Sequence, residues 1–170
     1  MSRELEYVGR SYPATDVAAK VRGALPYGTD LVLPGMLHAR LVLSPHAHAT
    51  VGAIDARRTL AVPGVVAVHS HETAPHATYC RYRILPDQAS CIDDERIFAS
   101  TARFVGDRVA AVVATTREAA RLGAQRLDIE YLRHSAVYSA QAALEPGAVE
   151  VHAGGNLVHQ FGLDLSLIHI

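Results

Sequence analysis

The sequence predicts a fold that mixes α-helices with β-strands, of the α+β or α/β class. Apolar residues recur in short blocks that alternate between the period of a strand and the period of a helix. Glycine and proline residues lie at the junctions between these blocks. The chain has 170 residues, of which 49% are hydrophobic and 19% are charged, and this length suits one domain with its own core.

The first predicted elements are a short helix and a strand. The helix begins after Asp16, whose carboxylate can accept the free amides of the first turn, and it ends at Gly23, which tolerates a left-handed exit. Residues 36–43 follow as a strand. Its alternation divides the side chains between two faces, Leu37, Ala39, Leu41 and Leu43 on one and His38, Arg40 and Val42 on the other.

A second extended run and a third strand follow. Residues 50–54 form the second run, and Asp55 is placed to cap a short helix over residues 55–62. Pro63 and Gly64 end that helix. Residues 65–70 are continuously apolar apart from the last two, so we expect a strand of the fully buried kind.

Residues 72–94 break the pattern. They include two prolines and both cysteines, so we expect a long surface excursion. Loops of this length in compact domains usually carry a function or contact a partner.

Regular elements return in the second half. Residues 102–115 contain two β-like runs around a tight connection at Gly106 and Asp107. Thr115 and Glu118 predict a capping box before a helix over residues 117–126. The inner face of this helix is expected to hold Ala119, Ala120, Leu122 and Gly123.

The last predicted elements are a strand, a short helix and a turn. In residues 127–132, Leu127, Ile129 and Tyr131 alternate with Asp128, Glu130 and Leu132. Residues 139–146 indicate a short helix, and residues 153–156 a glycine-rich turn.

Composition excludes several classes of protein. A formal net charge of -1 provides no field that would attract nucleic acid or an acidic membrane. No apolar run approaches the roughly 18–20 residues that span a bilayer, and residues 1–10 do not read as a secretory signal. Cys80 and Cys91 cannot form a disulfide framework, so a reduced, cytoplasmic protein is the simplest interpretation, with a single Cys80–Cys91 bridge as the alternative.

Phosphate-binding loops are absent from the sequence. A P-loop needs lysine followed by serine or threonine, whereas the single lysine, Lys20, precedes Val21. No G-x-G-x-x-G motif occurs, and Gly154 and Gly155 are interpreted as a turn.

Ten histidines raise the question of a metal site. His46 with His48 and His69 with His71 would each lie on one face of an extended segment. A zinc site needs a further ligand, and nothing in the sequence brings His76, Cys80 or Cys91 there. The alternative interpretation is that these histidines are exposed or at the edge of the core.

Other combinations of reactive side chains have equally simple explanations. Ser44, His46 and Asp55 could form a Ser/His/Asp arrangement, but a nucleophile elbow is absent. Residues 93–95 (Asp-Asp-Glu) are interpreted as solvated charge, and residues 81–83 (Arg-Tyr-Arg) are too few for a nucleic-acid site. We therefore assign no catalytic, cofactor-binding or metal-binding residue.

Several short motifs occur in one order along the chain. They begin with Gly9, residues 16–20 (DVAAK), Gly23–Ala24, Tyr27, Asp30, residues 35–37 (GML) and residues 44–49 (SPHAHA). They continue with Ile54–Asp55, residues 63–68 (PGVVAV), 104–114 (FVGDRVAAVVA), 118–120 (EAA), 129–131 (IEY) and 154–160 (GGNLVHQ). In this order the chain resembles the molybdenum-cofactor-binding subunit of the xanthine dehydrogenase and aldehyde oxidase family, most closely a bacterial xanthine dehydrogenase.

The resemblance implies an α+β fold of the α/β hammerhead type, a mixed sheet with a few packed helices. It implies a domain over residues 9–162, with residues 1–8 as an N-terminal tail and residues 163–170, which match nothing expected of the next domain, as a truncated or non-native tail. In the family this domain precedes those that hold molybdopterin and supply the catalytic base.

The resemblance also implies a function for the whole enzyme. That enzyme is an oxidoreductase that inserts a water-derived oxygen into a heterocycle or aldehyde and passes electrons to iron–sulfur (2Fe-2S) and FAD partners. We expect this chain to be an inactive structural part of it. One departure is the segment 132–135 (LRHS) after the last strand, where the family often has an acidic residue and Leu-Pro. The alternative function is a stand-alone binding or adaptor module that keeps the scaffold without the enzyme.

Overall fold

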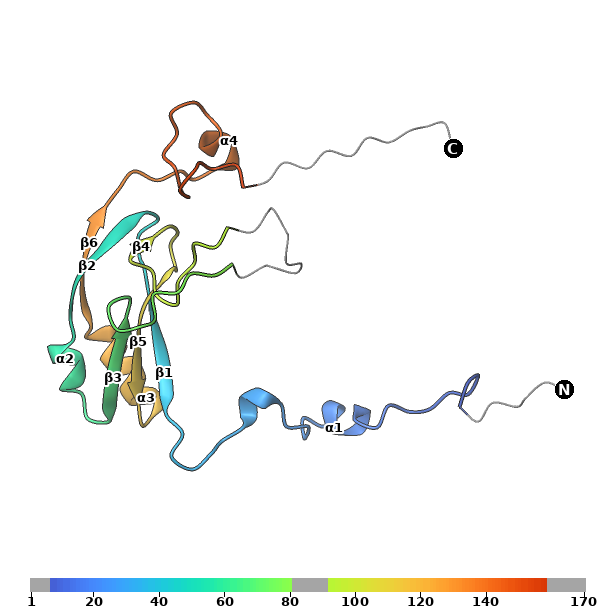
Figure 1. Cartoon of the computed structure of the whole chain (residues 1–170). Helices are drawn as coiled ribbons and strands as arrows, with labels where there is room; N and C mark the ends of the chain where they lie inside the picture. The colour runs from blue at the N-terminus through green and yellow to red at the C-terminus, as the bar shows by residue number, and fades with distance from the viewer. Residues whose placement is uncertain (1–6, 81–91, 159–170) are drawn as a thin grey trace, which may run out of the picture. The chain divides into compact units, whose positions relative to one another are not determined.

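The computed structural model describes residues 7–80 and 92–158 (Figure 1). Contacts divide the chain into two units, residues 1–36 and residues 37–170. Within the described residues, every strand and most of the helices belong to the second unit.

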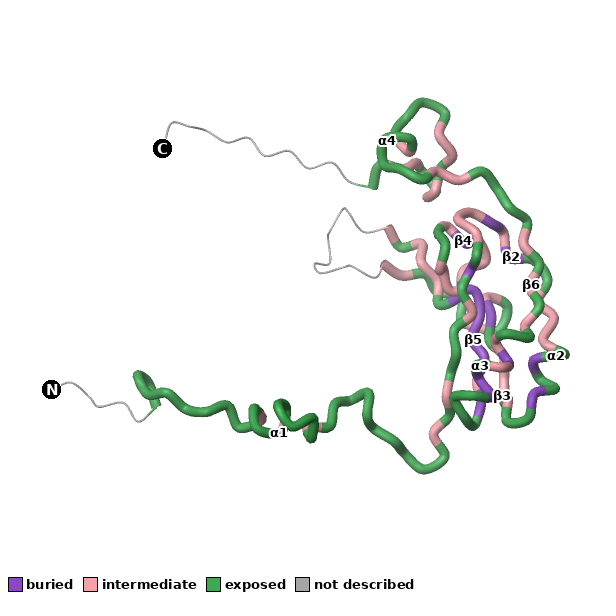
Figure 2. Tube along the Cα trace, turned by 180° about the vertical axis from the view of Figure 1, so that it is seen from behind, coloured by how far each residue is buried: buried purple, intermediate pink, exposed green. Residues whose placement is uncertain are grey.

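The first unit has two short helical segments and no buried residue in its described part. These segments are α1 (Val17–Val21) and the 3₁₀ turn η1 (Gly28–Asp30). Figure 2 shows residues 7–36 as largely exposed. The predicted exit at Gly23 is confirmed by a φ of +66°. The predicted cap at Asp16 is wrong, because this carboxylate pairs with Lys20 at 2.5 Å and accepts no amide of the first turn.

The second unit has two three-stranded antiparallel sheets. The first sheet has the order β1-β5-β3, with β1 (His38–Leu43), β5 (Arg108–Ala114) and β3 (Val65–Ser70). The second has the order β4-β2-β6, with β4 (Thr101–Ala102), β2 (Ala49–Asp55) and β6 (Asp128–Arg133). The described part of the unit also contains the helices α2 (Arg57–Leu60), α3 (Arg117–Gln125) and α4 (Ala140–Ala143). The predicted α+β class is confirmed, although the strands form two antiparallel sheets in place of one mixed sheet.

The core lies between the first sheet and α3, where Figure 2 shows most of the buried residues. Strand β5 is central, and its residues Val109, Ala110, Val112 and Ala114 are fully buried. The predicted inner residues Ala119, Ala120 and Gly123 of α3 are buried against it, as expected. From α2, the buried Thr59 donates its hydroxyl to the Gly123 carbonyl at 3.0 Å. Small residues on α3 therefore let the helix approach the sheet closely.

Burial of the strands differs from the prediction in one respect. Residues 65–70 were expected to be fully buried, but β3 is an edge strand and Val66 is 54% exposed. The central position belongs to β5, whose run of alanine and valine is equally apolar. A continuous apolar run predicts burial on both faces but does not say which strand is central.

The connection at Gly106 is a turn, as predicted, with a φ of +97°. The two runs that it joins do not pair with each other: β4 pairs with β2, while β5 pairs with β1 and β3. The turn thus carries the chain from one sheet to the other.

Caps of the other helices are partly as predicted. The cap residue of α2 is Ala56, so the predicted cap at Asp55 is one residue out, although Asp55 accepts the Arg57 amide at 2.9 Å. The cap of α3 is Thr116, which accepts the Ala119 amide at 3.1 Å, and not Thr115. The Thr115 hydroxyl instead lies 3.4 Å from the Gly64 carbonyl, to which it donates. The prediction was therefore one residue out.

Candidate functional site

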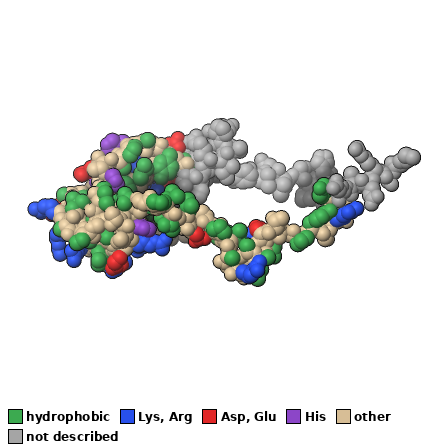
Figure 3. All heavy atoms as spheres, turned by 90° about the horizontal axis from the view of Figure 1, so that it is seen from below, with side chains coloured by type: hydrophobic (Ala, Val, Ile, Leu, Met, Phe, Trp, Pro, Cys, Tyr) green, Lys and Arg blue, Asp and Glu red, His purple; other side chains and the backbone are tan. Residues whose placement is uncertain are grey.

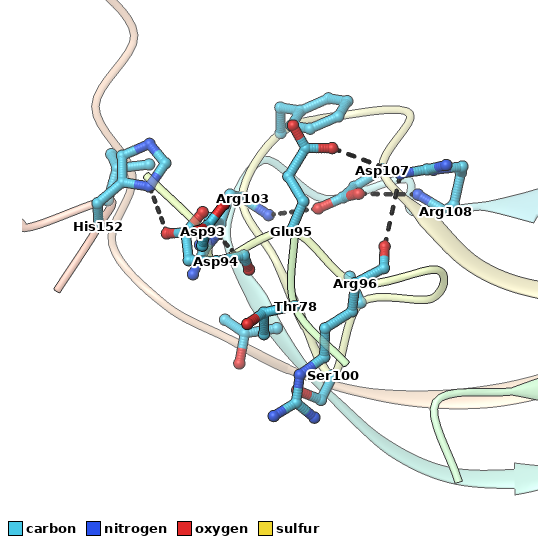
Figure 4. A pocket seen from close by; sticks show the side chains of 14 residues that line it. Thr78, Asp93, Asp94, Glu95, Arg96, Ser100, Arg103, Asp107, Arg108 and His152 are labelled. Atoms are coloured by element: carbon cyan, nitrogen blue, oxygen red, sulfur yellow. Dashed lines mark hydrogen bonds and ion pairs between the residues drawn. The ribbon is translucent and has the colours of Figure 1, made fainter. Parts of the chain in front are cut away.

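A cavity of about 610 Å³ lies where the segments around residues 93–108 meet residues 151 and 152 (Figure 4). Its walls combine apolar surface with charged side chains of both signs. They include the acidic residues Asp93, Asp94, Glu95 and Asp107 and the basic residues Arg96, Arg103, Arg108 and His152. No local sequence pattern predicted this cavity, because the two segments are far apart in the chain.

Asp94 is the centre of the network on one side of the cavity. One of its oxygens, Oδ2, forms an ion pair with Arg103 Nη1 at 3.0 Å and accepts from His152 Nδ1 at 2.6 Å. All three side chains are 20–28% exposed, so these contacts are shielded from solvent more than a surface pair. The prediction that residues 93–95 are solvated charge is wrong for Asp94, which joins the 92–103 segment to the C-terminal segment.

Arg108 organises the opposite side of the cavity. Its guanidinium lies 3.5 Å from the Glu95 carboxylate and donates to the Tyr79 hydroxyl at 2.9 Å. Tyr79 and Glu95 also exchange backbone hydrogen bonds at 2.9 and 3.1 Å. Asp107 accepts the backbone amides of Arg103 and Arg108 at 3.2 and 2.9 Å. Most of the charges in the cavity are therefore engaged in holding loops together.

The predicted pair His46 and His48 does not form a common site. The His46 ring contacts Tyr131 edge-on, with centroids 5.0 Å apart, and burial raises the pKa of Tyr131. The His48 ring lies beside His134, with centroids 5.0 Å apart. Within residues 7–80 and 92–158, no group of three or more His, Cys, Asp or Glu side chains is placed to hold a metal ion.

The proposed Ser/His/Asp combination is not assembled either. The buried Ser44 hydroxyl bonds to the backbone of His46, 2.9 Å from its carbonyl oxygen and 3.0 Å from its nitrogen. Asp55 lies at the far end of β2 and binds Arg57 through both carboxylate oxygens. This contact lowers the pKa of Asp55 to about 2. Ser44 is a turn residue, and Asp55 binds Arg57 at the start of α2.

The other candidate residues are the remaining histidines, the glycine pair and the cysteines. His69 and His76 are exposed, and His71 is half-buried with an Nδ1 atom that lacks a hydrogen-bond partner in the described structure. Gly154 and Gly155 form the predicted turn, with positive φ at both residues. Cys80 is disulfide-bonded, which contradicts the expected free thiol. Cys91 and residues 81–83 lie outside the described residues.

The described residues do not fit the molybdopterin cofactor that the family resemblance implies. A bound phosphate would meet four carboxylates in the cavity, and two of the three arginines there are already paired with acidic residues. Backbone amides bind anions mainly at the first turn of a helix. Neither the turn around Gly106 nor the turn at Gly154 is followed directly by a helix. We derive no catalytic step through this cofactor.

Together these features define a small α+β domain that is held by a helix packed on a sheet and has a cavity lined by paired charges. The chain matches the family described as aldehyde oxidase and xanthine dehydrogenase, a/b hammerhead domain, over residues 22–135. It belongs to this family, which confirms both the resemblance and the predicted hammerhead fold.

Named relatives are much longer than this chain. A probable hypoxanthine oxidase of Escherichia coli strain K12 is 36% identical over 149 residues, which cover 88% of this chain and 16% of that protein. A probable xanthine dehydrogenase subunit of Bacillus subtilis strain 168 is 34% identical over 146 residues, which cover 85% and 18%. The chain thus spans less than a fifth of the length of either relative.

Solved structures give the same result. The aldehyde oxidoreductase of Desulfovibrio gigas superposes with a TM-score of 0.76 at 30% identity, covering 86% of this chain and 17% of that one. Quinoline 2-oxidoreductase of Pseudomonas putida 86 also gives 0.76, at 31% identity, covering 89% and 20%. The chain therefore corresponds to a small part of a molybdenum hydroxylase subunit, as predicted.

Proposed function

We propose that this chain serves as the supporting hammerhead region of a molybdenum-dependent oxidoreductase of the xanthine and aldehyde dehydrogenase type. The observation that carries this proposal is a 36% identity that extends over 88% of the chain but only 16% of the relative. Relatives include a protein named the xanthine dehydrogenase molybdenum-binding subunit in Escherichia coli O157:H7. The chemistry of such an enzyme resides in the remaining part.

The role of the chain's own residues in that enzyme is to stabilise the fold of this region. In the complete enzyme, bound molybdenum–molybdopterin supplies the oxygen-transfer chemistry, and iron–sulfur and FAD partners take up the electrons. The paired charges around Asp94 and Arg108 fix two loops and the C-terminal segment against each other. On this proposal the isolated chain is inactive, because its charged groups stabilise loops and its described residues offer no cradle for the cofactor.

Activity and metal content test the proposal directly. The purified 170-residue chain is assayed with xanthine, hypoxanthine and an aromatic aldehyde in the presence of an artificial electron acceptor, and its molybdenum is measured by elemental analysis. We expect neither turnover nor stoichiometric molybdenum. The Escherichia coli hypoxanthine oxidase relative, treated identically, is the control. Hydroxylase activity with bound molybdenum in the short chain would overturn the proposal.

A chimaera tests the supporting role more sharply. Residues 22–135 replace the matched segment of the Escherichia coli relative. If the region is a scaffold, the chimaera keeps molybdenum and its order of substrate preference. A folded chimaera that holds molybdenum but has a changed substrate preference would show that the hammerhead region selects substrates.

The adaptor alternative differs in its genetic surroundings. An enzyme subunit predicts a reading frame that encodes the remaining domains, beside genes for iron–sulfur and flavin subunits. A stand-alone module predicts a stop codon after Ile170 and unrelated neighbours. The nucleotide sequence beyond codon 170 separates the two.

The cytoplasmic location stays a proposal. Among the described residues, no helix has both the length and the apolar character needed to cross a bilayer. A disulfide at Cys80 is unusual in reducing compartments, so thiol labelling of the protein in intact cells is the measurement that bears on location.

A further inference from the structure

His48 and His134 are neighbours in the structure although the sequence spacing pairs His48 with His46. His48 lies just before β2 and His134 just after β6. Their ring centroids are 5.0 Å apart and the ring planes are tilted by 54°. With zinc–nitrogen bonds of about 2.0–2.1 Å, two imidazoles on one ion have ring centres roughly 5 Å apart. The observed spacing, which is also that of two rings in contact, therefore leaves room for one metal ion bound by both rings.

The backbone fixes this neighbourhood before any ligand arrives. The His134 amide donates to the His48 carbonyl at 3.0 Å. The adjacent residues Ala49 and Arg133 face each other in the antiparallel ladder of β2 and β6. Because both backbones belong to one sheet edge, bringing the rings together costs little conformational entropy.

The hydrogen bond of His48 determines which ring nitrogen is available. Nδ1 lies 2.7 Å from the Ser135 carbonyl oxygen. A carbonyl oxygen can only accept, so in a neutral ring Nδ1 carries the proton and Nε2 has a free lone pair. Metal-ligating histidines usually donate their second ring nitrogen to a carbonyl or carboxylate in this way, which orients the ring.

His134 is held by a similar contact. Its Nε2 lies 2.8 Å from the Thr50 hydroxyl. When Nε2 donates to this hydroxyl, Nδ1 has the free lone pair. Each ring thus uses one nitrogen to bind the protein and keeps the other for a ligand.

Solvent access and local charge permit an ion at this position. His134 is exposed and His48 is half-buried, so water can fill the other coordination positions. Arg103 lines a small hollow with His48, but its charge is balanced by Asp94 at 3.0 Å.

We propose that His48 and His134 form a two-histidine binding site for a divalent transition-metal ion of the zinc, nickel or copper type. Imidazole favours these ions over magnesium and calcium. The ion would bridge the start of β2 and the exit of β6. This site is separate from the molybdenum chemistry proposed for the whole enzyme and does not depend on it.

Calorimetric titration of the purified full chain with zinc chloride, and separately with magnesium chloride, tests the site. We expect one zinc ion per chain in the tightest class of sites, no comparable magnesium binding, and a zinc-dependent rise in the unfolding temperature. His48→Ala and His134→Ala should each abolish this class. Thr50→Val should weaken it by about 10-fold, the lower end of the effect of losing an outer-shell partner.

Two controls separate the site from other histidines and from misfolding. His46→Ala, which removes a ring that contacts Tyr131, should leave the zinc affinity unchanged. Long-range ¹H–¹⁵N spectra should show His48 with a proton on Nδ1, and zinc should shift the Nε2 resonance of that ring. Circular dichroism verifies that each variant is folded. Zinc binding of unchanged affinity in the His48→Ala, His134→Ala double variant, or no zinc binding by the wild-type chain, would overturn the proposal.

Discussion

Replacing Gly123 by alanine should destabilise the fold, although alanine is the better helix former. Gly123 lies in the buried face of α3. A Cβ atom there would lie 2.9 Å from Val112 Cγ1 and 3.0 Å from Val65 Cγ2. Real Cβ contacts are rarely so short, so the helix or the two valines must move.

The two opposing effects can be compared. Removing the flexibility of glycine favours the helix by roughly 0.5–1 kcal/mol. Overpacking a well-packed core costs about 1–3 kcal/mol. Val112 is fully buried in the central strand and its β-branched side chain has little rotamer freedom, so the clash is not easily relieved. We expect a net loss of about 1–2 kcal/mol in the free energy of unfolding.

Urea unfolding followed by circular dichroism measures this difference. Gln125→Ala, at an exposed position of the same helix, is the matched control and should change stability by less than about 0.5 kcal/mol. Val112→Ala alone should cost about 2 kcal/mol. In the double variant Gly123→Ala, Val112→Ala, the new methyl group fills part of the space that the valine left. The loss of unfolding free energy in the double variant should be smaller than the sum of the two single losses by roughly 1 kcal/mol.

Two results would refute the reasoning. If Gly123→Ala is neutral or stabilising, α3 does not approach β5 as closely as the structure indicates. If the double variant is additive, Gly123 and Val112 do not share a contact.

Three further predictions concern other parts of the chain. Thr116→Ala should cost about 1 kcal/mol in urea unfolding, whereas a loss of that size in Thr115→Ala and not in Thr116→Ala would contradict the observed cap. Limited trypsin digestion should cleave after Lys20 and Arg22 well before any site in residues 37–80 or 92–158, because no residue in 7–36 is fully buried; simultaneous cleavage in the two described regions would contradict this. The NMR titration of Asp55 should have its midpoint near pH 2. Because that pKa is lowered by Arg57, its contribution to stability is present above about pH 4 and is lost as the pH falls towards 2; in Arg57→Gln the midpoint should return towards about 4.

Local signals predicted most of the elements of the second unit. The alternation of residues 127–132 appears in β6, where Ile129 and Tyr131 are half-buried and Asp128 and Glu130 are exposed. Small residues at helical spacing correctly indicated the inner face of α3. In both places the period of the sequence matches the period of the structure, and neither result depends on distant residues.

Predictions that depend on pairing between distant segments were less successful. The runs on either side of Gly106 are both β-like, yet they enter different sheets. Likewise the cap of α3 is Thr116 in place of Thr115, because the Thr115 hydroxyl contacts the turn at Gly64. Sequence alone did not say which of two adjacent threonines would be used.

The candidate site was hidden for the same reason. Asp94 contacts His152 and Arg103, but nothing in the local sequence of Asp94 distinguishes a buried network from solvated charge. His48 and His134 are equally remote in sequence. The signals that sequence did offer, such as the His46-x-His48 spacing, described an isolated segment and not the packing of its side chains.

Exposed apolar side chains on and beside β1 agree with the proposed role as part of a larger subunit. Leu37, Leu41 and Leu43 are 46–49% exposed. They lie on or next to β1, which is an edge strand of its sheet. Folded proteins normally cover such an edge with another element or place charged side chains along it. Figure 3 shows acidic and basic side chains with apolar ones between them on the visible face. If the remaining part of the subunit covers the leucines, Leu41→Lys should solubilise the isolated chain and impair assembly of the whole subunit, whereas a role of Leu41 in this domain's own core predicts unfolding of both.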